Sequence, residues 1–322
     1  MKKVKLGNTN EIVSALCLGT DSIGSKIDRE TSFRLLDYYF EKGGSFLDTA
    51  NFYASWVPGC SGGESETTIG MWMRERKNRD GLFIASKLGF DYPGTDGGLN
   101  SEEIEQECEK SLKRLGIDRI DLYYAHRDDR ETLLEETMES FARLVKAGKV
   151  RYIGASNIKV WRIAEANKFC QLNDLPQYCA VQQRFTYLRP RHGVSFGPQL
   201  FINDDLIDFC KASQLTLIAY SILLQGAYTR SERPIPAQFA GPDTDSRLDV
   251  LNGTAKEAGV SPNQIIISWM LEREYPILPI IAGSKIEQLS ENIAALEIEL
   301  TEEQMKRLNT AGNPKLEQEW LR

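Results

Sequence analysis

The stretch "SFLDTANFYASW" (residues 45–56) begins like a buried β-strand and ends in polar and aromatic residues. Its apolar start, Phe46 and Leu47, runs directly into an acid, Asp48, and a tyrosine, Tyr53, follows five residues later. In α/β proteins, the residues that follow a buried strand often carry the chemistry. We therefore looked along the chain for other apolar runs that close on a polar side chain.

The composition is that of an ordinary globular protein, with 41% hydrophobic and 26% charged residues in a chain of 322. The net charge of −7 argues against nucleic acid or an anionic membrane as the main partner, because both favour basic faces. We find neither a signal-peptide pattern nor an apolar run of about 20 residues that could span a bilayer. The six cysteines form no C-x-x-C pair, so we expect them to be reduced and mostly buried. These features predict a cytoplasmic protein.

Short apolar runs alternate with segments of helical periodicity. The runs predict strands at 13–20, 45–50, 82–87, 121–126, 152–157, 180–185, 215–220 and 279–284. The periodic segments predict helices at 29–42, 64–77, 101–116, 131–147, 160–171, 203–213 and 247–273, the last broken at 259–262. In the segment 101–116, Ser101 and Gly116 supply N-cap and C-cap signals.

Eight buried strands alternating with helices favour a closed parallel (β/α)8 TIM barrel. An open doubly wound sheet is the alternative, but residues 19–22 after the first strand do not form the expected G-x-G-x-x-G turn. Turn residues at 7–10, between runs containing Val4 and Ile12, predict an N-terminal β-hairpin that closes the bottom of the barrel. No linker or low-complexity tract interrupts the chain, so we expect one domain over 1–322.

Catalytic residues of such barrels lie where the strands end. Polar residues that close the runs are Asp48, Lys87, His126, Ser156 with Asn157, and Tyr220, whereas Gln182 lies early in its run. Singly, each has an ordinary structural explanation, such as a capping acid or a lysine that reaches solvent. Together, an acid, a cation and an imidazole from three adjacent strands would meet at one mouth, with Tyr53 in the loop above Asp48.

This set of side chains is suited to protonating a developing alkoxide. The phenol of Tyr53 has an ordinary pKa near 10, and a neighbouring ammonium such as Lys87 lowers that pKa. Asp48 would hold the ammonium, and His126 would bind a carbonyl oxygen or relay the proton. General acid catalysis of this kind contributes roughly 10²- to 10⁴-fold. The set supplies a proton but no electrons.

The chain resembles the aldo-keto reductase superfamily over nearly its full length. Matching segments, in order, are KLGNTNEIVSALCLGT, FLDTANFY, ASKLG, DLYYAH, VRYIGASN, LIAYSILLQGAYT and IIAGSKIEQLSENIAAL. The resemblance implies that Asp48, Tyr53, Lys87 and His126 are the catalytic residues, with Tyr53 as proton donor. It also implies that the electrons come from NADP(H), with NAD(H) as the alternative because Ala282 stands where relatives often carry a cation.

The resemblance further implies how the dinucleotide binds. Ser156, Asn157 and Gln182 would hold the nicotinamide carboxamide, and Tyr220 would stack on the ring. The turn after Tyr220 would contact the pyrophosphate, and the segment 283–292 would bind the 2'-phosphate and adenine at a helix N-terminus. The implied cofactor-binding residues are Thr20, Ser156, Asn157, Gln182, Tyr220, Ser221, Leu223, Gln225, Gly283, Ser284, Lys285, Gln288, Glu291 and Asn292.

Residues expected around the substrate are Trp56, Phe90 and Arg127. For Arg127, an ion pair with Asp128 or Asp129 is the competing explanation. Three other tryptophans, Trp72, Trp161 and Trp269, are expected to be packing residues rather than site aromatics because they lie in helical patterns.

The sequence therefore predicts a reductase of aldehydes or ketones, with sugar-like compounds among the candidate small-molecule carbonyl substrates. A nucleotide-binding regulatory or subunit-like barrel with little catalysis is the main alternative. An unrelated barrel isomerase or hydrolase has no phosphate loop, metal-ligand cluster or paired carboxylates in its favour, and we expect no metal site. Homo-oligomer formation is left open.

Overall fold

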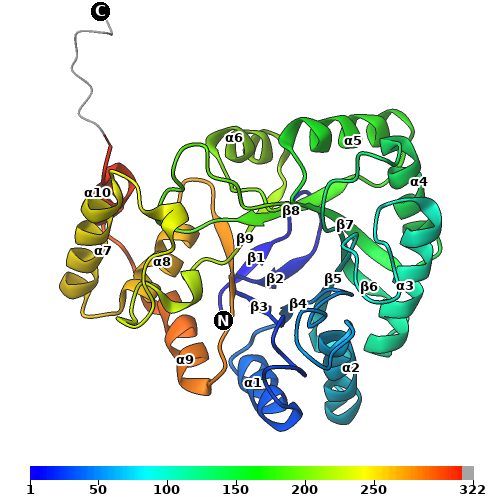
Figure 1. Ribbon diagram of the computed structural model, residues 1–322, viewed down its shortest axis with the longest axis horizontal. Helices are drawn as coiled ribbons and strands as arrows, with labels where there is room; N and C mark the ends of the chain where they lie inside the picture. The colour runs from blue at the N-terminus through cyan, green and yellow to red at the C-terminus, as the bar shows by residue number, and fades with distance from the viewer. Residues whose placement is uncertain (314–322) are drawn as a thin grey trace, which may run out of the picture.

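The computed structural model describes residues 1–313, in which eight parallel strands close into a barrel surrounded by helices (Figure 1). The barrel strands are β3 (Cys17–Gly19), β4 (Phe46–Asp48), β5 (Phe83–Leu88), β6 (Ile120–Ala125), β7 (Val150–Ser156), β8 (Tyr178–Arg184), β9 (Thr216–Tyr220) and β10 (Ile277–Ile281). Each strand pairs with its sequence neighbours, and β10 pairs with β3 to complete the circle. The (β/α)8 TIM-barrel prediction is confirmed. The predicted domain range of 1–322 extends into 314–322, which lie outside the described residues.

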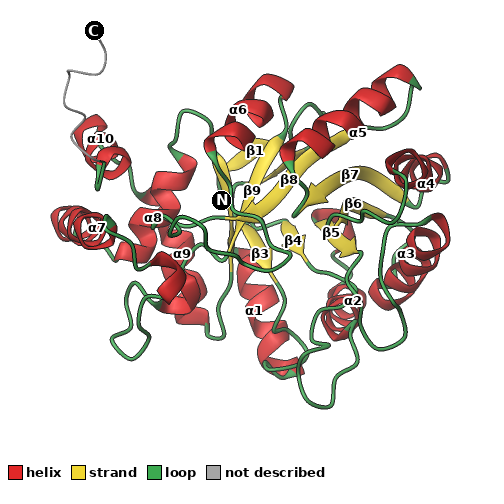
Figure 2. Ribbon diagram, turned by 45° about the horizontal axis from the view of Figure 1, so that its top comes forward, coloured by secondary structure: helices red, strands yellow, loops and turns green. Residues whose placement is uncertain are grey.

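Helices cover the outside of the barrel, as the red ribbons around the yellow strands show in Figure 2. They are α1 (Arg29–Glu41), α2 (Glu64–Arg76), α3 (Ser101–Leu115), α4 (Leu134–Lys146), α5 (Val160–Leu172), α6 (Asp204–Ser213), α7 (Thr244–Ala258), α8 (Pro262–Leu271), α9 (Ile286–Ala294) and α10 (Glu302–Thr310). The predicted break between α7 and α8 is confirmed, with Ser261 as N-cap of α8 in a capping box. Within the described range, we find no helix with the length and apolar character needed to cross a membrane.

Several predicted boundaries are wrong for local reasons. The expected first strand, 13–20, is divided between the end of a hairpin strand and the barrel strand β3. The N-cap of α3 is Asn100 rather than Ser101, because the Asn100 side chain accepts the backbone N–H of Glu103 at 3.0 Å. The helix expected from residue 131 begins at Leu134.

The late start of α4 follows from a turn centred on Asp129. Its carboxylate accepts hydrogen bonds from the backbone N–H groups of Glu131 and Thr132, at 2.9 and 3.3 Å. These two N–H groups therefore have a side-chain partner and do not need a helical one. Helix α10 was not predicted, although Thr301 and Gln304 form a capping box at its start.

An N-terminal hairpin closes the bottom of the barrel, as predicted. Strands β1 (Lys3–Lys5) and β2 (Ile12–Ser14) pair antiparallel, and Leu6 and Val13 are fully buried in the cluster that fills the barrel. Gly7 lies so close to β8 that a Cβ atom would stand 2.3 Å from the Cys179 carbonyl oxygen, at a φ of +51°. Only glycine fits this close approach without strain.

Alternation along each strand decides which side chains face the inside of the barrel. On β5, Ala85 belongs to the interior cluster and Lys87 lies on the same face, whereas Ser86 points outward and donates to Glu66 on α2. On β6, Leu122 and Tyr124 are interior, which places the next residue on that face, His126, above them at the mouth.

The predicted packing roles of the tryptophans are confirmed for two of three. Trp72 and Trp269 are buried, but Trp161 on α5 is 50% exposed, with the guanidinium of Arg130 at 4.9 Å from its ring. All six cysteines are free and five are buried, as expected, whereas Cys60 is half-buried.

We expect the hairpin to be required for stability because it fills the open end of the barrel. Truncation of the fully buried side chain in Leu6→Ala should cost about 2–5 kcal/mol of unfolding free energy. Ile12→Ala, in the same hairpin but 54% exposed, is the matched control and should change stability by about 0.5 kcal/mol or less. Denaturant unfolding followed by circular dichroism measures both. Equal small effects would show that the hairpin does not stabilise the barrel.

Candidate active site

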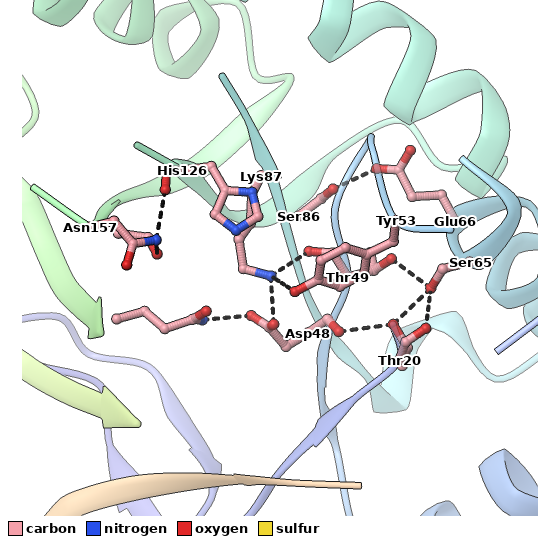
Figure 3. A network of polar contacts seen from close by, with 12 residues as sticks. Thr20, Asp48, Thr49, Tyr53, Ser65, Glu66, Ser86, Lys87, His126 and Asn157 are labelled. Atoms are coloured by element: carbon pink, nitrogen blue, oxygen red, sulfur yellow. Dashed lines mark hydrogen bonds and ion pairs between the residues drawn. The ribbon is translucent and has the colours of Figure 1, made fainter. Parts of the chain in front are cut away.

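The ammonium of Lys87 lies at the centre of a polar cluster at the C-terminal mouth of the barrel (Figure 3). It is fully buried and donates to Asp48 Oδ1 at 2.6 Å, to the Thr49 carbonyl oxygen at 2.8 Å and to the Tyr53 hydroxyl at 2.8 Å. An ammonium has three donors and no acceptor, so all three N–H groups are used. The structure therefore brings the predicted Asp48, Lys87 and Tyr53 into direct contact.

Strand register produces this contact. Asp48 ends β4 and lies opposite Ala85 of β5, so Lys87 stands one pleat further along the same inner face. The second carboxylate oxygen, Asp48 Oδ2, accepts the side-chain amide of Gln182 from β8 at 2.8 Å. Both oxygens of Asp48 thus accept hydrogen bonds, which is the pattern of an ionised acid.

Tyr53 is held in the loop after β4 by a strained backbone. The next residue, Ala54, is buried and has a φ of +78°, a left-handed conformation that costs a non-glycine residue free energy. Such strain collects at functional sites when the surroundings over-determine it. The result is a phenol fixed over Lys87, whose Nζ lies 4.6 Å from the ring centroid.

Burial dominates the acid–base properties of Tyr53. Desolvation raises the pKa of the phenol well above its ordinary value, and the carboxylate of Asp48 raises it further. The prediction of a lowered pKa is therefore wrong for this structure, because removal from water outweighs the nearby ammonium. Tyr53 holds its proton at neutral pH, and Lys87 is the group placed to stabilise the phenolate when that proton leaves.

His126 lies beside Tyr53, with 6.2 Å between the ring centroids. Burial, with a smaller contribution from the Lys87 charge, holds the pKa of the imidazole well below its ordinary value. The ring is therefore neutral at physiological pH, with one nitrogen as donor and one as acceptor. Its Nδ1 is buried and has no hydrogen-bond partner in the described part of the chain. An unpaired polar atom beside the Tyr53 hydroxyl is a feature typical of functional sites.

Aromatic side chains line the mouth around these groups. Phe52 is the central one: its ring centroid lies 4.9 Å from that of Phe90, 5.2 Å from that of His126 and 5.3 Å from that of Trp56. Trp56, which is 47% exposed, and Phe90 thus both pack against Phe52, and their predicted contact with a substrate stays a prediction. Phe52 was missed. The sequence signal that could have identified Phe52 was its position directly before Tyr53.

Arg127 has a different partner from either one expected. Its Nη1 lies 3.3 Å from Asp91 Oδ1, and its guanidinium carbon lies 5.3 Å from the centre of the Phe90 ring. Asp128 instead pairs with Arg130 and Arg162. The expected pairing within the 127–129 segment is therefore wrong, because the loop after β5 offers Asp91 beside Phe90.

The residues expected to hold a nicotinamide adjoin this cluster. Asn157 Nδ2 donates to Ser156 Oγ at 3.1 Å and to the His126 carbonyl oxygen at 3.0 Å, and the Tyr220 hydroxyl donates to Asn157 Oδ1 at 2.7 Å. Gln182 is the fifth residue of β8, near its end, because this strand begins at Tyr178 rather than at 180. Five neighbouring strands, β4 to β8, together with Tyr220 on β9, thus contribute side chains to one rim.

Thr20 is buried and supports the same rim from below. Its hydroxyl donates to the Asp48 carbonyl oxygen at 2.8 Å, and its own hydroxyl and carbonyl oxygens accept from Ser65. The side chain of Thr20 therefore already has hydrogen-bond partners within the protein. Its predicted contact with a cofactor stays a prediction.

The turn after β9 has an unusual backbone. Ser221, Leu224 and Gln225 have φ values of +58°, +46° and +57°, although none is a glycine, and Leu223 between them is half-buried. Residues in left-handed conformations occur in the backbone nests that bind anions in many proteins. This is the segment expected to contact a pyrophosphate.

The predicted phosphate-binding segment surrounds the start of α9. Lys285 is the exposed N-cap of α9, and no side chain caps this helix end. Gln288 Oε1 accepts the backbone N–H of Ser284 at 2.8 Å, beside Gly283. Glu291 and Asn292 are bonded to Ser261 and to the Ala282 carbonyl oxygen, so their side chains already have structural partners.

Behind the site, two buried carboxylates that the sequence did not indicate hold its loops. Glu107 on α3 accepts from Asn51 at 2.6 Å and from Tyr92 at 2.7 Å, and so links the loops that follow β4 and β5. Glu66 on α2 accepts from Ser86 and, at 2.6 Å, from Arg114. We find no cluster of three or more potential metal ligands within residues 1–313.

Comparisons with known proteins point to one family. The model of the Aldo/keto reductase family matches residues 15–313. A norsolorinic acid reductase of Aspergillus flavus is 30% identical over 318 residues, which cover 93% of this chain and 78% of the relative. The norsolorinic acid reductase stcV of Emericella nidulans is 31% identical, with 91% and 76% covered, and an aryl-alcohol dehydrogenase of Pestalotiopsis microspora is 29% identical, with 92% and 78% covered.

The depressed pKa of His126 has a direct spectroscopic consequence. An ordinary imidazole gains a proton as the pH falls through about 6.5, whereas His126 should stay neutral because burial and Lys87 oppose its positive charge. NMR of 15N-histidine-labelled protein between about pH 8 and pH 6 should show no titration of this ring. The chain has only one other histidine, so His126→Gln assigns the signals. A His126 signal that shifts with a midpoint near 6.5 would contradict the neutral assignment.

Proposed function

The chain belongs to the aldo/keto reductase family, and we propose that it is an NADP(H)-dependent oxidoreductase that reduces an aldehyde or ketone to an alcohol, with Tyr53 as proton donor. Members of this family generally use NAD(P)H and act on small-molecule carbonyl compounds. One observation carries the proposal. The buried Lys87 ammonium donates simultaneously to Asp48 and to the hydroxyl of Tyr53, which is itself next to the neutral ring of His126.

The roles of the four side chains follow from their contacts. When bound, the nicotinamide supplies the hydride that adds to the carbonyl carbon. Tyr53 gives its phenolic proton to the carbonyl oxygen as negative charge develops there. The Lys87 ammonium, 2.8 Å from the hydroxyl, stabilises the phenolate that remains, and Asp48 keeps that ammonium oriented. His126, neutral at physiological pH, positions the carbonyl oxygen by donating a ring N–H to it.

Several features of the mouth fit a dinucleotide. Gln182, Asn157 and Ser156 present amide and hydroxyl groups that match a carboxamide, next to the ring of Tyr220. The left-handed turn 221–225 offers backbone N–H groups to a pyrophosphate. The uncapped start of α9, with Lys285 beside it, suits a further phosphate, because helix N-termini favour anions. This last feature supports NADP(H) over NAD(H).

The aromatic lining favours an aryl carbonyl substrate. Phe52, Trp56 and Phe90 present ring faces and edges beside Tyr53 and His126, and aromatic groups pack well against one another in such arrangements. Relatives are a reductase named for norsolorinic acid and an aryl-alcohol dehydrogenase, which supports the same class. We therefore favour an aryl aldehyde or ketone over the sugar-like compounds considered from the sequence. A cytoplasmic location is part of the proposal.

The competing function is a nucleotide-binding regulatory or subunit-like barrel with little catalysis. Replacement of Tyr53 by phenylalanine separates the two. In Tyr53→Phe, NADPH-dependent turnover of 4-nitrobenzaldehyde should fall roughly 10²- to 10⁴-fold, while NADPH binding is retained, because only the proton donor is removed. Steady-state NADPH oxidation and NADPH fluorescence quenching measure the two properties.

Tyr38→Phe, on α1 away from the mouth, is the matched control and should leave turnover unchanged. If Tyr53→Phe keeps full activity, Tyr53 is not the proton donor. If the unmodified protein binds NADPH and turns over no aldehyde or ketone, the regulatory function stands instead.

The choice between the two nucleotides should depend on Lys285. Lys285→Ala removes the exposed cation at the start of α9 and should weaken NADPH binding several-fold to about tenfold, with little change for NADH, which lacks the extra phosphate. Fluorescence titrations of both nucleotides provide the ratio of dissociation constants. An equal loss of affinity for both nucleotides would show that Lys285 contacts a part of the cofactor that NADPH and NADH share.

A further inference from the structure

A guanidinium without a counter-ion stands at the mouth of the barrel. Arg184 is the last residue of β8 and lies in register with Tyr220, the last residue of β9. On β8, Ala180 belongs to the interior cluster and Gln182 reaches Asp48, so alternation places Arg184 on the same inner face, above Gln182. Its position in the chain thus directs it toward the candidate site.

Neutral partners hold this guanidinium in place. Arg184 Nη1 donates to Gln199 Oε1 at 2.6 Å, and the guanidinium carbon lies 4.9 Å from the centre of the Phe196 ring. Arg184 Nε is buried and has no hydrogen-bond partner among the described residues. Burial lowers the pKa of Arg184, but arginine stays charged in proteins. A positive charge is therefore kept partly desolvated, with one buried N–H group unpaired, which is costly unless a ligand completes it.

Two other cations beside the candidate site have counter-ions. Lys87 is paired with Asp48, and Arg127 is paired with Asp91. Within residues 1–313, we find no carboxylate that forms an ion pair with Arg184. Arg184 therefore carries a positive charge at the mouth that no carboxylate among the described residues balances, and its planar fork matches carboxylates in a bidentate manner.

Arg184 is also connected to the residues expected around the nicotinamide. Its backbone N–H donates to the Leu200 carbonyl oxygen at 2.9 Å, and the backbone N–H of Leu200 donates to Asn157 Oδ1 at 3.2 Å. The same loop, after β8, supplies both Gln199 and Phe196 to the guanidinium. A group bound by Arg184 would thus lie close to Asn157 and Tyr220.

We propose that Arg184 is a specificity-determining residue that binds the carboxylate of an anionic carbonyl substrate at the rim of the site. This inference rests on the proposed reductase function and deepens it, because it adds a negative charge to the aryl carbonyl class. A phosphate of the dinucleotide shares this chemistry. We favour the substrate because the turn 221–225 and the start of α9 already provide separate phosphate positions.

The test compares two product analogues of matched shape, 4-(hydroxymethyl)benzoate and 4-(hydroxymethyl)benzamide, by calorimetry with the NADP⁺-saturated protein. Arg184→Gln should weaken binding of the benzoate about 10- to 100-fold and leave the benzamide within about threefold, because only the benzoate has the charge to lose. Arg184→Lys should retain part of the preference, since it keeps the charge but not the planar fork. The benzamide also reports whether each variant is folded.

Two further measurements decide between explanations. Lys113→Gln removes one exposed positive charge on α3, far from the rim, and should leave the benzoate preference unchanged. If Arg184→Gln leaves the benzoate preference unchanged, or weakens NADPH binding instead, the proposal is overturned, and the second result assigns the site to a cofactor phosphate.

Turnover of 4-carboxybenzaldehyde and 4-carbamoylbenzaldehyde is measured separately. An Arg184-dependent benzoate preference without any turnover would support the anion site and reject the reductase function.

Discussion

The candidate site depends on one buried ion pair, between the ammonium of Lys87 and the carboxylate of Asp48. Removal of two such charges from water costs several kcal/mol of free energy per ion, and this cost is offset only when every donor and acceptor has a hydrogen-bond partner. Here Lys87 donates to three oxygens, and both oxygens of Asp48 accept hydrogen bonds. These hydrogen bonds can form only if β4, β5 and β8 meet around one axis, as they do in a closed barrel. Barrel closure and the chemistry we propose are therefore coupled.

The surroundings of this pair determine what it can do. Burial keeps Tyr53 protonated and His126 neutral, because desolvation penalises the charged form of each group. The strained Ala54 fixes Tyr53 over Lys87, and Glu107 behind the site ties together the loops that carry Tyr53 and Phe90. The site thus combines a proton held in a dry environment with an ammonium placed to receive the resulting negative charge.

The sequence predicted the architecture well because its strongest signals are local. Apolar runs that close on Asp48, Lys87 and His126 predicted both the barrel and the shared rim. Signals that depend on tertiary contacts were weaker: the partner of Arg127 is Asp91, from another loop, and the exposure of Trp161 is invisible in a helical pattern. The direction of the Tyr53 pKa shift was wrong because a sequence reveals the neighbouring cation but not the extent of burial. Arg184 and Phe52 were overlooked since neither matches a motif that we considered.

The central claim is that Asp48 and Lys87 act as one unit on the proton of Tyr53. The most direct measurement is a double-mutant cycle on the single-turnover rate of NADPH oxidation with an aryl aldehyde, using Asp48→Asn, Lys87→Met and the double variant. Residues that act as a unit show strongly non-additive losses. We expect the double variant to be about as slow as Lys87→Met alone. Losses that add on a free-energy scale would show that the two side chains act independently and would contradict the claim.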